Sequence, residues 1–261
     1  MEKDFEKTPS FYANDKVFKK FLYKTSFYQG LQKNLLGIVK KLKPENVLEL
    51  GFGTGQTSFL VAKQNKNSNL VSVDMRNEMV DVASGLAEKY KINNIKFVQG
   101  DMSSYVKQDL TQFDFIFMLY AFHHIPDPHQ NKIEFLKQCY KNMKKGAYIC
   151  IAEAFVPENL SDEGADPRIL SIWQERGKES YASVFWNCLN GLDEKSIAKA
   201  ETIASYSQSM ELMAGELVAG RNNEYLVKIS WLAIEAEKIG FKTILNENIN
   251  SIADSILLFQ K

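Results

Sequence analysis

The sequence predicts an α/β fold in which a mostly parallel, seven-stranded sheet carries helices on both faces. Between residues 46 and 151, short apolar segments alternate with segments of helical periodicity. Such alternation is typical of a parallel sheet that is covered on both sides. The first apolar segment runs directly into a glycine-rich turn, and the alternation is interrupted only after Phe155, by a long segment of helical patterns. These observations predict one α/β domain with a helical insertion.

Composition and charge already disfavour several classes of protein. The chain has 261 residues, of which 45% are hydrophobic and 25% charged, and Lys plus Arg equal Asp plus Glu at 32 each. A neutral total gives no field to steer nucleic acid, so a nucleic-acid substrate is disfavoured. The three cysteines lack metal-like spacing, the N-terminus has no apolar signal core, and no apolar run reaches the ~20 residues of a membrane span. We therefore expect a cytoplasmic, soluble protein, as a monomer or homodimer.

The N-terminal part is expected to be helical. Apolar residues recur at near-helical spacing from Phe11 to Leu42, and Gly30 is expected to separate two helices. Pro44 should end the second helix, because the residue before a proline is pushed out of the helical region.

The strands and helices follow in order along the chain. Strands are expected at Val47–Leu50, Leu70–Val73, Ile95–Val98, Phe113–Leu119, Ala147–Ile151, Phe241–Leu245 and Ile256–Phe259. Helices are expected at Thr57–Gln64, Glu78–Tyr90, Ile133–Met143 and Leu226–Lys238. Polar residues stand at the ends of the first five strands, where ligands of such sheets bind: Glu49, Asp74, Asp101, Tyr120 and Glu153. The expected boundaries are 1–43 for the N-terminal helices, 44–156 for the ligand-binding core, 157–224 for the insertion and 225–261 for the last helix and strands.

The glycine segment "VLELGFGTG" distinguishes between ligands. A nucleotide-binding P-loop needs Lys and Ser or Thr after its last glycine, but Gln56 follows Gly55. The dinucleotide fingerprint needs a third glycine where Gln56 stands. Glu49, placed before the first glycine, would repel a pyrophosphate and favour a cationic group. S-adenosylmethionine carries both an ammonium and a sulfonium.

Four segments, each at a strand end, resemble the class I S-adenosylmethionine-dependent methyltransferases of the small-molecule type. They are "VLELGFGTG", "VSVDM", "FVQGDM" and "FDFIFMLYAFHHIPD". The resemblance covers roughly Val47 to Ile151 and the terminal strands, and it implies a Rossmann-like fold. It also implies that Asp74 accepts the ribose hydroxyls, Asp101 accepts from the adenine amino group and Met102 flanks the ring. The implied cofactor-binding residues are Glu49, Gly51, Gly53, Gly55, Asp74, Met75, Asp101, Met102 and Tyr120.

The glycines, Asp74 and Asp101 also have a purely structural interpretation. The glycines could form only a tight turn between strand and helix. Asp74 could cap the helix that follows it, and Asp101 could cap a short helix through Ser103 and Ser104.

The residues expected near the methyl acceptor indicate their roles less clearly than the cofactor-binding segments do. His123 and His124 follow the fourth strand, and either could act as a base at neutral pH; alternatively the pair only packs the loop before Pro126. His129, followed by polar residues, is expected at the surface, and no metal is expected. The resemblance implies that the N-terminal helices and the insertion form a lid over the acceptor, with Tyr12, Trp173 and Trp186 as candidate substrate contacts. Those aromatics could instead form the core of the insertion.

The sequence therefore predicts methyl transfer from S-adenosylmethionine to a small molecule or short peptide, with S-adenosylhomocysteine as product. Another adenosyl-sulfonium chemistry, such as aminopropyl transfer, is the alternative among enzymes. A non-catalytic cofactor-binding subunit is the alternative outside them, and an NAD-dependent dehydrogenase is the least favoured.

Overall fold

The computed structural model describes residues 26–53, 55–127, 129–156, 158–159, 225–249 and 254–261. Of the expected lid segments, residues 1–25 and all of the insertion except 158–159 lie outside these residues, as do Tyr12, Trp173, Trp186 and Cys188. The chain divides into two units, and the unit of residues 30–162 and 223–261 contains the whole sheet. The account below concerns that unit.

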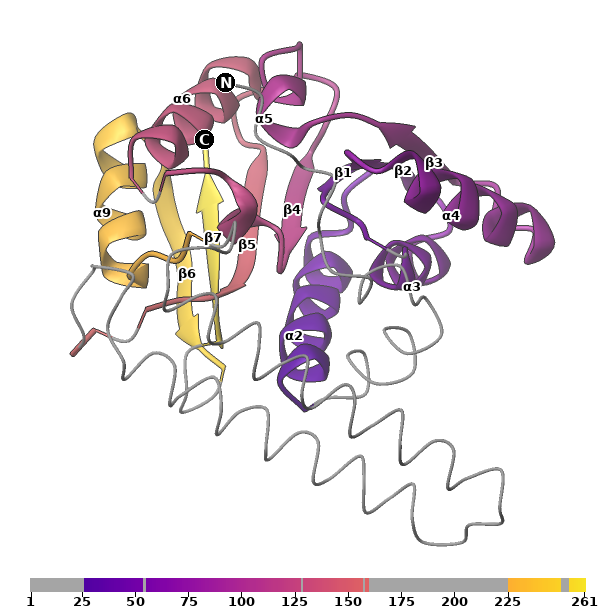
Figure 1. The fold of residues 1–261 in the computed structure, drawn as a ribbon, viewed down its shortest axis with the longest axis horizontal. Coiled ribbons are helices and arrows are strands. Elements are labelled where there is room, and N and C mark those ends of the chain that lie inside the picture. The colour runs from indigo at the N-terminus through magenta and orange to yellow at the C-terminus, as the bar shows by residue number, and fades with distance from the viewer. Residues whose placement is uncertain (1–25, 54, 128, 157, 160–224, 250–253) are drawn as a thin grey trace, which may run out of the picture. The chain divides into compact units, whose positions relative to one another are not determined.

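Seven strands form one sheet (Figure 1). They are β1 (Asn46–Leu50), β2 (Asn69–Asp74), β3 (Ile95–Gln99), β4 (Phe115–Leu119), β5 (Tyr148–Ala154), β6 (Lys242–Asn248) and β7 (Asp254–Gln260). Their order is β3-β2-β1-β4-β5-β7-β6. The first five strands are parallel, and β7 runs antiparallel to both β5 and β6. The predicted fold class, a mostly parallel seven-stranded sheet, is confirmed.

The helices alternate with the strands. They are α2 (Ser26–Leu42), α3 (Gln56–Gln64), α4 (Asn77–Lys89), α5 (Met102–Tyr105), the short 3₁₀ helix η3 (Phe122–His124), α6 (Gln130–Asn142) and α9 (Ile229–Ile239). The predicted helices agree with α3, α4, α6 and α9 to within a few residues at each end. The short helix α5 was expected only as the alternative role of Asp101, and η3 was not predicted.

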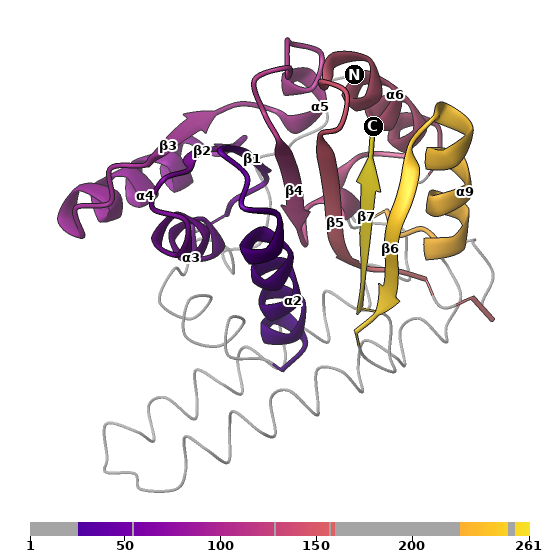
Figure 2. The ribbon, with the colours of Figure 1, turned by 180° about the vertical axis from the view of Figure 1, so that it is seen from behind.

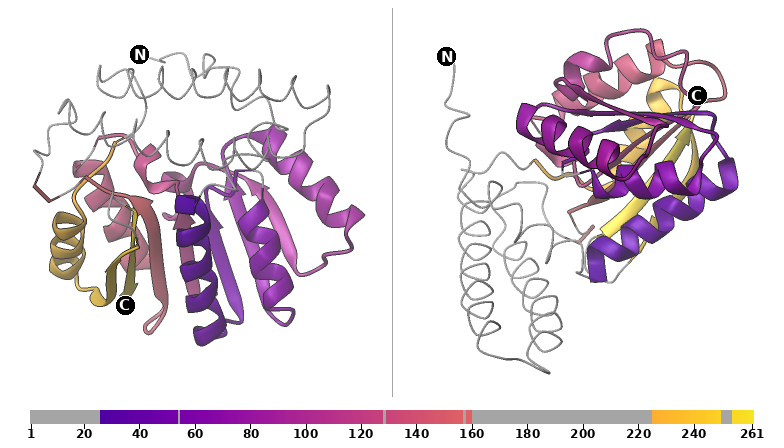
Figure 3. Two further views of the ribbon diagram at one scale, coloured as in Figure 1. Left: turned by 90° about the horizontal axis from the view of Figure 1, so that it is seen from below. Right: turned by 90° about the vertical axis from the view of Figure 1, so that its right-hand side faces the viewer.

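Side-chain alternation along the strands divides the core between the two faces of the sheet. In β1, Leu48 and Leu50 join the apolar cluster that contains Phe135 of α6 and Leu232 of α9. Glu49 points the other way and is hydrogen-bonded to Ser58 of α3. The helices α6 and α9 therefore cover one face, and α3 lies on the other with α4, as Figure 2 shows from behind. Figure 3 shows the same layers from two further directions.

The predicted helix break at Gly30 is wrong. The helix α2 continues through Gly30 to Leu42, and Leu31, Leu35 and Val39 along one side of it are fully buried. A helical glycine costs about 1 kcal/mol relative to alanine, which this packing outweighs. The helix ends at Lys43, which has a φ of 49° before Pro44.

Candidate functional site

The glycine turn between β1 and α3 forms one side of the site. All three glycines have positive φ, 80° at Gly51, 55° at Gly53 and 78° at Gly55. A Cβ at Gly51 would lie 2.4 Å from the Cβ of Ala121, so glycine is needed there for close packing against the segment after β4. A Cβ at Gly53 would meet no atom of the described residues within 4 Å. Gly51 thus serves the fold, whereas Gly53 faces open space that a ligand can occupy.

Asp74, the last residue of β2, fixes this turn. Its Oδ2 accepts a hydrogen bond from the backbone N–H of Gly53 at 2.8 Å, and its Oδ1 accepts from the N–H of Arg76 at 3.0 Å. Burial raises the pKa of the carboxyl group above its ordinary value. The alternative that Asp74 caps the next helix is wrong, because Arg76 is the N-cap of α4.

Glu49 lies under the turn and is only 2% exposed. The hydroxyls of Ser58 and Ser72 both donate to its Oε2, the latter at 2.7 Å. Burial raises the pKa of Glu49 to about 7, although both hydroxyls oppose the shift. The carboxyl group is therefore poised to ionise when a cation comes near it.

Residues after β2 and β3 supply an exposed edge beside Asp74. Met75 is 55% exposed, Met102 is half-buried and packs on the main core, and Asp101 is exposed. Oδ1 of Asp101 accepts from the N–H of Ser104 at 2.8 Å, so Asp101 does cap a short helix, α5. This structural role leaves the second carboxylate oxygen of Asp101 for a ligand donor.

Tyr120 follows β4 with a φ of 50°. Its hydroxyl donates to Oδ1 of Asp254, the first residue of β7, at 2.7 Å, and Asp254 is fully buried. Tyr120, expected as a cofactor contact, therefore reaches past the end of β5 toward β7.

The histidines occupy the turn that follows. His123 Nδ1 lies 2.9 Å from Oε1 of Glu153, and Oε2 of the same carboxylate accepts from the backbone N–H of His123 at 3.3 Å. Glu153 is 2% exposed and also accepts from the N–H of Ala154. His124 is exposed, with its ring centroid 4.0 Å from that of His123. His129 is partly exposed, and its ring centroid lies 4.7 Å from that of Trp231.

Two further residues of this region were not predicted as site residues from the sequence. Glu153 was recognised only as a polar strand end, because its pairing with His123 spans thirty positions. Lys132 of α6 was not singled out, yet it is fully buried and its Nζ donates to the carbonyl oxygens of Phe122 and Ile125. Its place in the apolar stripe of α6, with Phe135, is the signal that could have found it.

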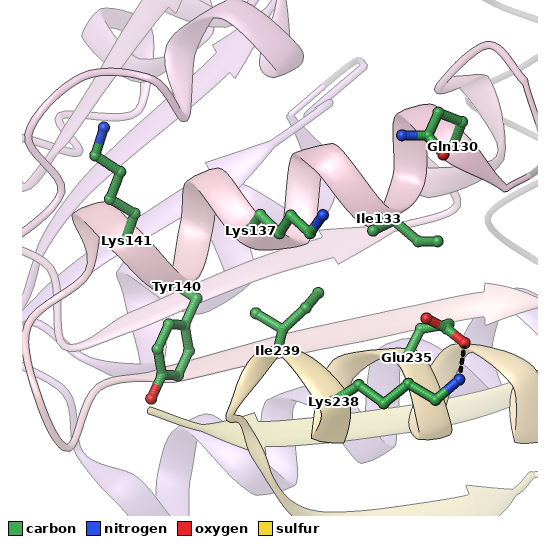
Figure 4. Close-up of a pocket in the computed structure, with 8 residues that line it drawn as sticks. All are labelled: Gln130, Ile133, Lys137, Tyr140, Lys141, Glu235, Lys238 and Ile239. Atoms are coloured by element: carbon green, nitrogen blue, oxygen red, sulfur yellow. Dashed lines mark hydrogen bonds and ion pairs between the residues drawn. The ribbon is translucent and has the colours of Figure 1, made fainter.

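A shallow groove lies elsewhere, between α6 and α9 (Figure 4). It is lined by Gln130, Ile133, Lys137, Tyr140, Lys141, Glu235, Lys238 and Ile239. Lys238 is paired with Glu235 within the groove at 2.7 Å. None of the predicted site residues lines it.

Two findings concern only the residues described here. No group of three or more His, Cys, Asp or Glu residues among them is arranged to hold a metal ion. None of their helices is both long and apolar enough to cross a bilayer.

The described residues fit an adenosyl cofactor. Gly53 leaves open space over the turn, Asp74 and Asp101 are acceptors after neighbouring strands, and Met75 offers an exposed thioether beside them. This arrangement lies on a Rossmann-like sheet of order β3-β2-β1-β4-β5-β7-β6, at the carboxyl ends of the parallel strands, where ligands of such sheets bind.

The chain belongs to the class I S-adenosylmethionine-dependent methyltransferase family. A family model described as a methyltransferase domain matches residues 41–206, which is more than half of the chain. The uncharacterized methyltransferase YcgJ of Bacillus subtilis is 26% identical over 159 residues, which are 60% of this chain and 56% of that protein. The chain thus spans about half the length of this relative.

Solved structures agree in fold. An O-methyltransferase family protein from Burkholderia thailandensis is 12% identical, with a TM-score of 0.59, over 97% of this chain and 62% of the other. A SAM-dependent methyltransferase from Aquifex aeolicus is 15% identical, with a TM-score of 0.53, over 94% of this chain and 96% of the other.

Proposed function

We propose that this protein transfers a methyl group from S-adenosylmethionine to a small molecule or short peptide whose nucleophilic atom arrives protonated. The observation that carries the proposal is the contact between His123 and the buried carboxylate of Glu153. Membership of the family supports the cofactor, and the histidine pair supports an acceptor that must lose a proton.

The cofactor would be held at β1, β2 and β3. Asp74 would accept from the ribose, Asp101 from the adenine amino group, and Gly53 would give the backbone room to approach. Glu49 would contribute negative charge close to the ammonium and sulfonium. When bound, the cofactor supplies an electrophilic methyl group, so the protein has mainly to align the acceptor with it.

His123 would act as the base. An imidazole that donates its Nδ1–H to a carboxylate carries its lone pair on Nε2. Nε2 would take the proton that the acceptor atom loses as it receives the methyl group from sulfur, whose bonding pair stays with S-adenosylhomocysteine. Glu153 would stabilise the resulting imidazolium. His123 contacts the buried carboxylate of Glu153, and His124 is the more exposed of the two residues. We therefore assign His123 as base and His124 as a contact to the acceptor.

Activity assays test this proposal. The protein is incubated with S-adenosylmethionine and a mixture of phenols, amines, thiols and short peptides, and S-adenosylhomocysteine is measured by mass spectrometry. With an acceptor in hand, His123→Ala should lower kcat about 10²–10⁴-fold and leave the affinity for S-adenosylhomocysteine unchanged. His124→Ala is the matched control and should have a smaller effect on kcat.

Other outcomes would favour the alternatives. Release of methylthioadenosine from decarboxylated S-adenosylmethionine would indicate aminopropyl transfer. Tight binding of S-adenosylhomocysteine with no turnover of any acceptor would indicate a binding subunit. Full activity of His123→Ala would remove the base assignment while leaving methyl transfer in place.

A further inference from the structure

Lys132 is a charged residue at a position where the fold calls for an apolar one. The buried side of α6 consists of Lys132, Phe135, Leu136 and Cys139, spaced as one helical stripe, and Lys132 is fully buried. Burying an ammonium group costs several kcal/mol unless it is compensated, and desolvation lowers the pKa of Lys132 to about 7. A leucine would fill such a position without this cost. The contacts of Lys132 must therefore explain why a lysine is present.

The lysine contacts both ends of the turn that carries the histidines. Its Nζ donates to the carbonyl oxygen of Phe122 at 3.0 Å and to that of Ile125 at 2.9 Å. The same nitrogen lies 4.8 Å from the centre of the Phe122 ring. The carbonyl oxygen between them, that of His123, accepts from the N–H of Tyr225 at 2.7 Å. Lys132 therefore ties the 3₁₀ turn to α6 by hydrogen bonds, beside the ring contact between Phe122 and Phe135 of α6.

Lys132 is also linked electrostatically to the carboxylate that contacts His123. Glu153, from β5, and Asp127, from the loop before α6, both favour its charged form. In the described part of the chain the other titratable groups at this turn are His124 and, through its interaction with Asp127, His129. Glu153 thus interacts with the imidazole of His123 and with the ammonium of Lys132.

We propose that Lys132 is a positioning residue for the acceptor side of the site, which pins the turn of His123 and His124 through two carbonyl groups and offsets the charge of Glu153. The inference rests on the proposed function insofar as His123 is the base. Pinning keeps the imidazole aligned with Glu153. The nearby positive charge disfavours the imidazolium form, so His123 remains an unprotonated base at lower pH than Glu153 alone would allow.

Two substitutions of Lys132 separate the effect of its hydrogen bonds from the effect of its charge. Lys132→Met keeps an unbranched side chain but removes both the donors and the charge, whereas Lys132→Gln keeps an amide donor without the charge. Lys137→Met, on the exposed side of α6, is the matched control. The full-length protein is used in every case. The measurements are kcat and KM against pH, the affinity for S-adenosylhomocysteine by calorimetry, and titration of the histidine ring protons by NMR. The chain has only three histidines, so single histidine variants assign the signals.

The proposal predicts a different result for each of the three variants. Lys132→Met should lower kcat roughly 10–100-fold through misalignment of the base, with little change in the affinity for S-adenosylhomocysteine. Lys132→Gln should recover part of that loss, and both its histidine titration and the acidic limb of its kcat profile should move to higher pH. Lys137→Met should behave as wild type.

Several results would overturn the proposal. One is a wild-type kcat in Lys132→Met together with an unchanged His123 titration in Lys132→Gln. Another is loss of the fold in both variants, which would mean that Lys132 supports the whole core rather than the turn. The NMR titration needs no methyl acceptor. If the wild-type protein shows no methyl transfer, the proposed function fails, while a shifted His123 titration would still support the role of Lys132.

Discussion

At the scale of single residues, Asp74 holds the glycine turn and is also the proposed contact to the ribose. Its two carboxylate oxygens hold the backbone N–H groups of Gly53 and Arg76, and its proposed ligand is the ribose. Since hydrogen bonds to charged groups contribute about 1.5–3 kcal/mol, Asp74→Ala should weaken binding of S-adenosylmethionine about 10- to 150-fold. Calorimetry measures this, with the exposed Asp81→Ala of α4 as control. Unchanged affinity would remove Asp74 from the site.

Glu49 makes the stability of the protein depend on pH. Burial raises its pKa from 4.5 to about 7 in the folded state. The folded state therefore binds the proton more tightly than the unfolded chain does. The stabilisation is complete below about pH 4.5 and is lost as the pH rises through about 7. Glu49→Gln removes this dependence and should be more stable than the wild type above pH 7, by up to about 3 kcal/mol.

Urea unfolding at pH 5 and pH 8 checks this prediction about Glu49. The stability difference between Glu49→Gln and the wild type should be larger at pH 8, and Glu78→Gln, exposed on α4, should show no such trend. Equal differences at the two pH values would contradict it. Weaker binding of S-adenosylmethionine by the more stable variant would indicate that Glu49 is kept for the cationic ligand at a cost to stability.

At the scale of elements, the glycine turn offers a comparison between two neighbouring positions. Gly51→Ala puts a methyl group 2.4 Å from the Cβ of Ala121 and a side chain at a φ of 80°. It should lower the free energy of unfolding by about 2–4 kcal/mol. Gly53→Ala meets no protein atom within 4 Å and should cost only the roughly 1–2 kcal/mol of the left-handed backbone. Gly53→Val should abolish cofactor binding, because its side chain would fill the open space.

Urea unfolding and calorimetry on the same proteins separate the two roles of the glycine turn. Gly51→Ala should lose more stability than Gly53→Ala. Gly53→Val should remain folded and lose affinity for the cofactor. A Gly53→Val protein that binds normally would mean that the glycine serves only the turn.

The elements that were predictable from the sequence are those specified by local patterns. The strand β4 is apolar at all five positions and buried at all of them, so its pattern alone predicts it. Gly30 misled because helix propensity is a local quantity, whereas the buried side of α2 is formed by distant contacts. The turn η3 and the partners Glu153 and Lys132 were missed for the same reason. Glu153 contacts a residue thirty positions away, and Lys132 contacts backbone carbonyl groups of a turn in a neighbouring element. Periodicity carries no information about such contacts.

At the scale of the whole sheet, the site has two parts along one edge. The proposed cofactor residues lie at the ends of β1, β2 and β3, on one side of the switch between β1 and β4. On the other side, His123 follows β4 and Glu153 lies near the end of β5. Open α/β sheets bind ligands at such a switch point. Donor and acceptor would therefore meet above the ends of β1 and β4, where Gly51 packs against Ala121.

This arrangement predicts which ligands stabilise the folded protein. A ligand that binds only the folded state adds about 2.7 kcal/mol at a concentration of 100 times its Kd, which corresponds to roughly 5–10 °C in Tm for a domain of this size. S-adenosylhomocysteine should produce such a shift, because its amino group suits Glu49 and its ribose suits Asp74. NADH should not, because its pyrophosphate would have to lie beside Glu49 and the turn has Gln56 where a third glycine is needed. Thermal unfolding with each ligand measures the difference, and Asp74→Ala should reduce the shift with S-adenosylhomocysteine. Equal stabilisation by NADH would contradict the assignment of the cofactor, because a site with Glu49 under its glycine turn cannot favour a pyrophosphate and a cationic amino acid alike.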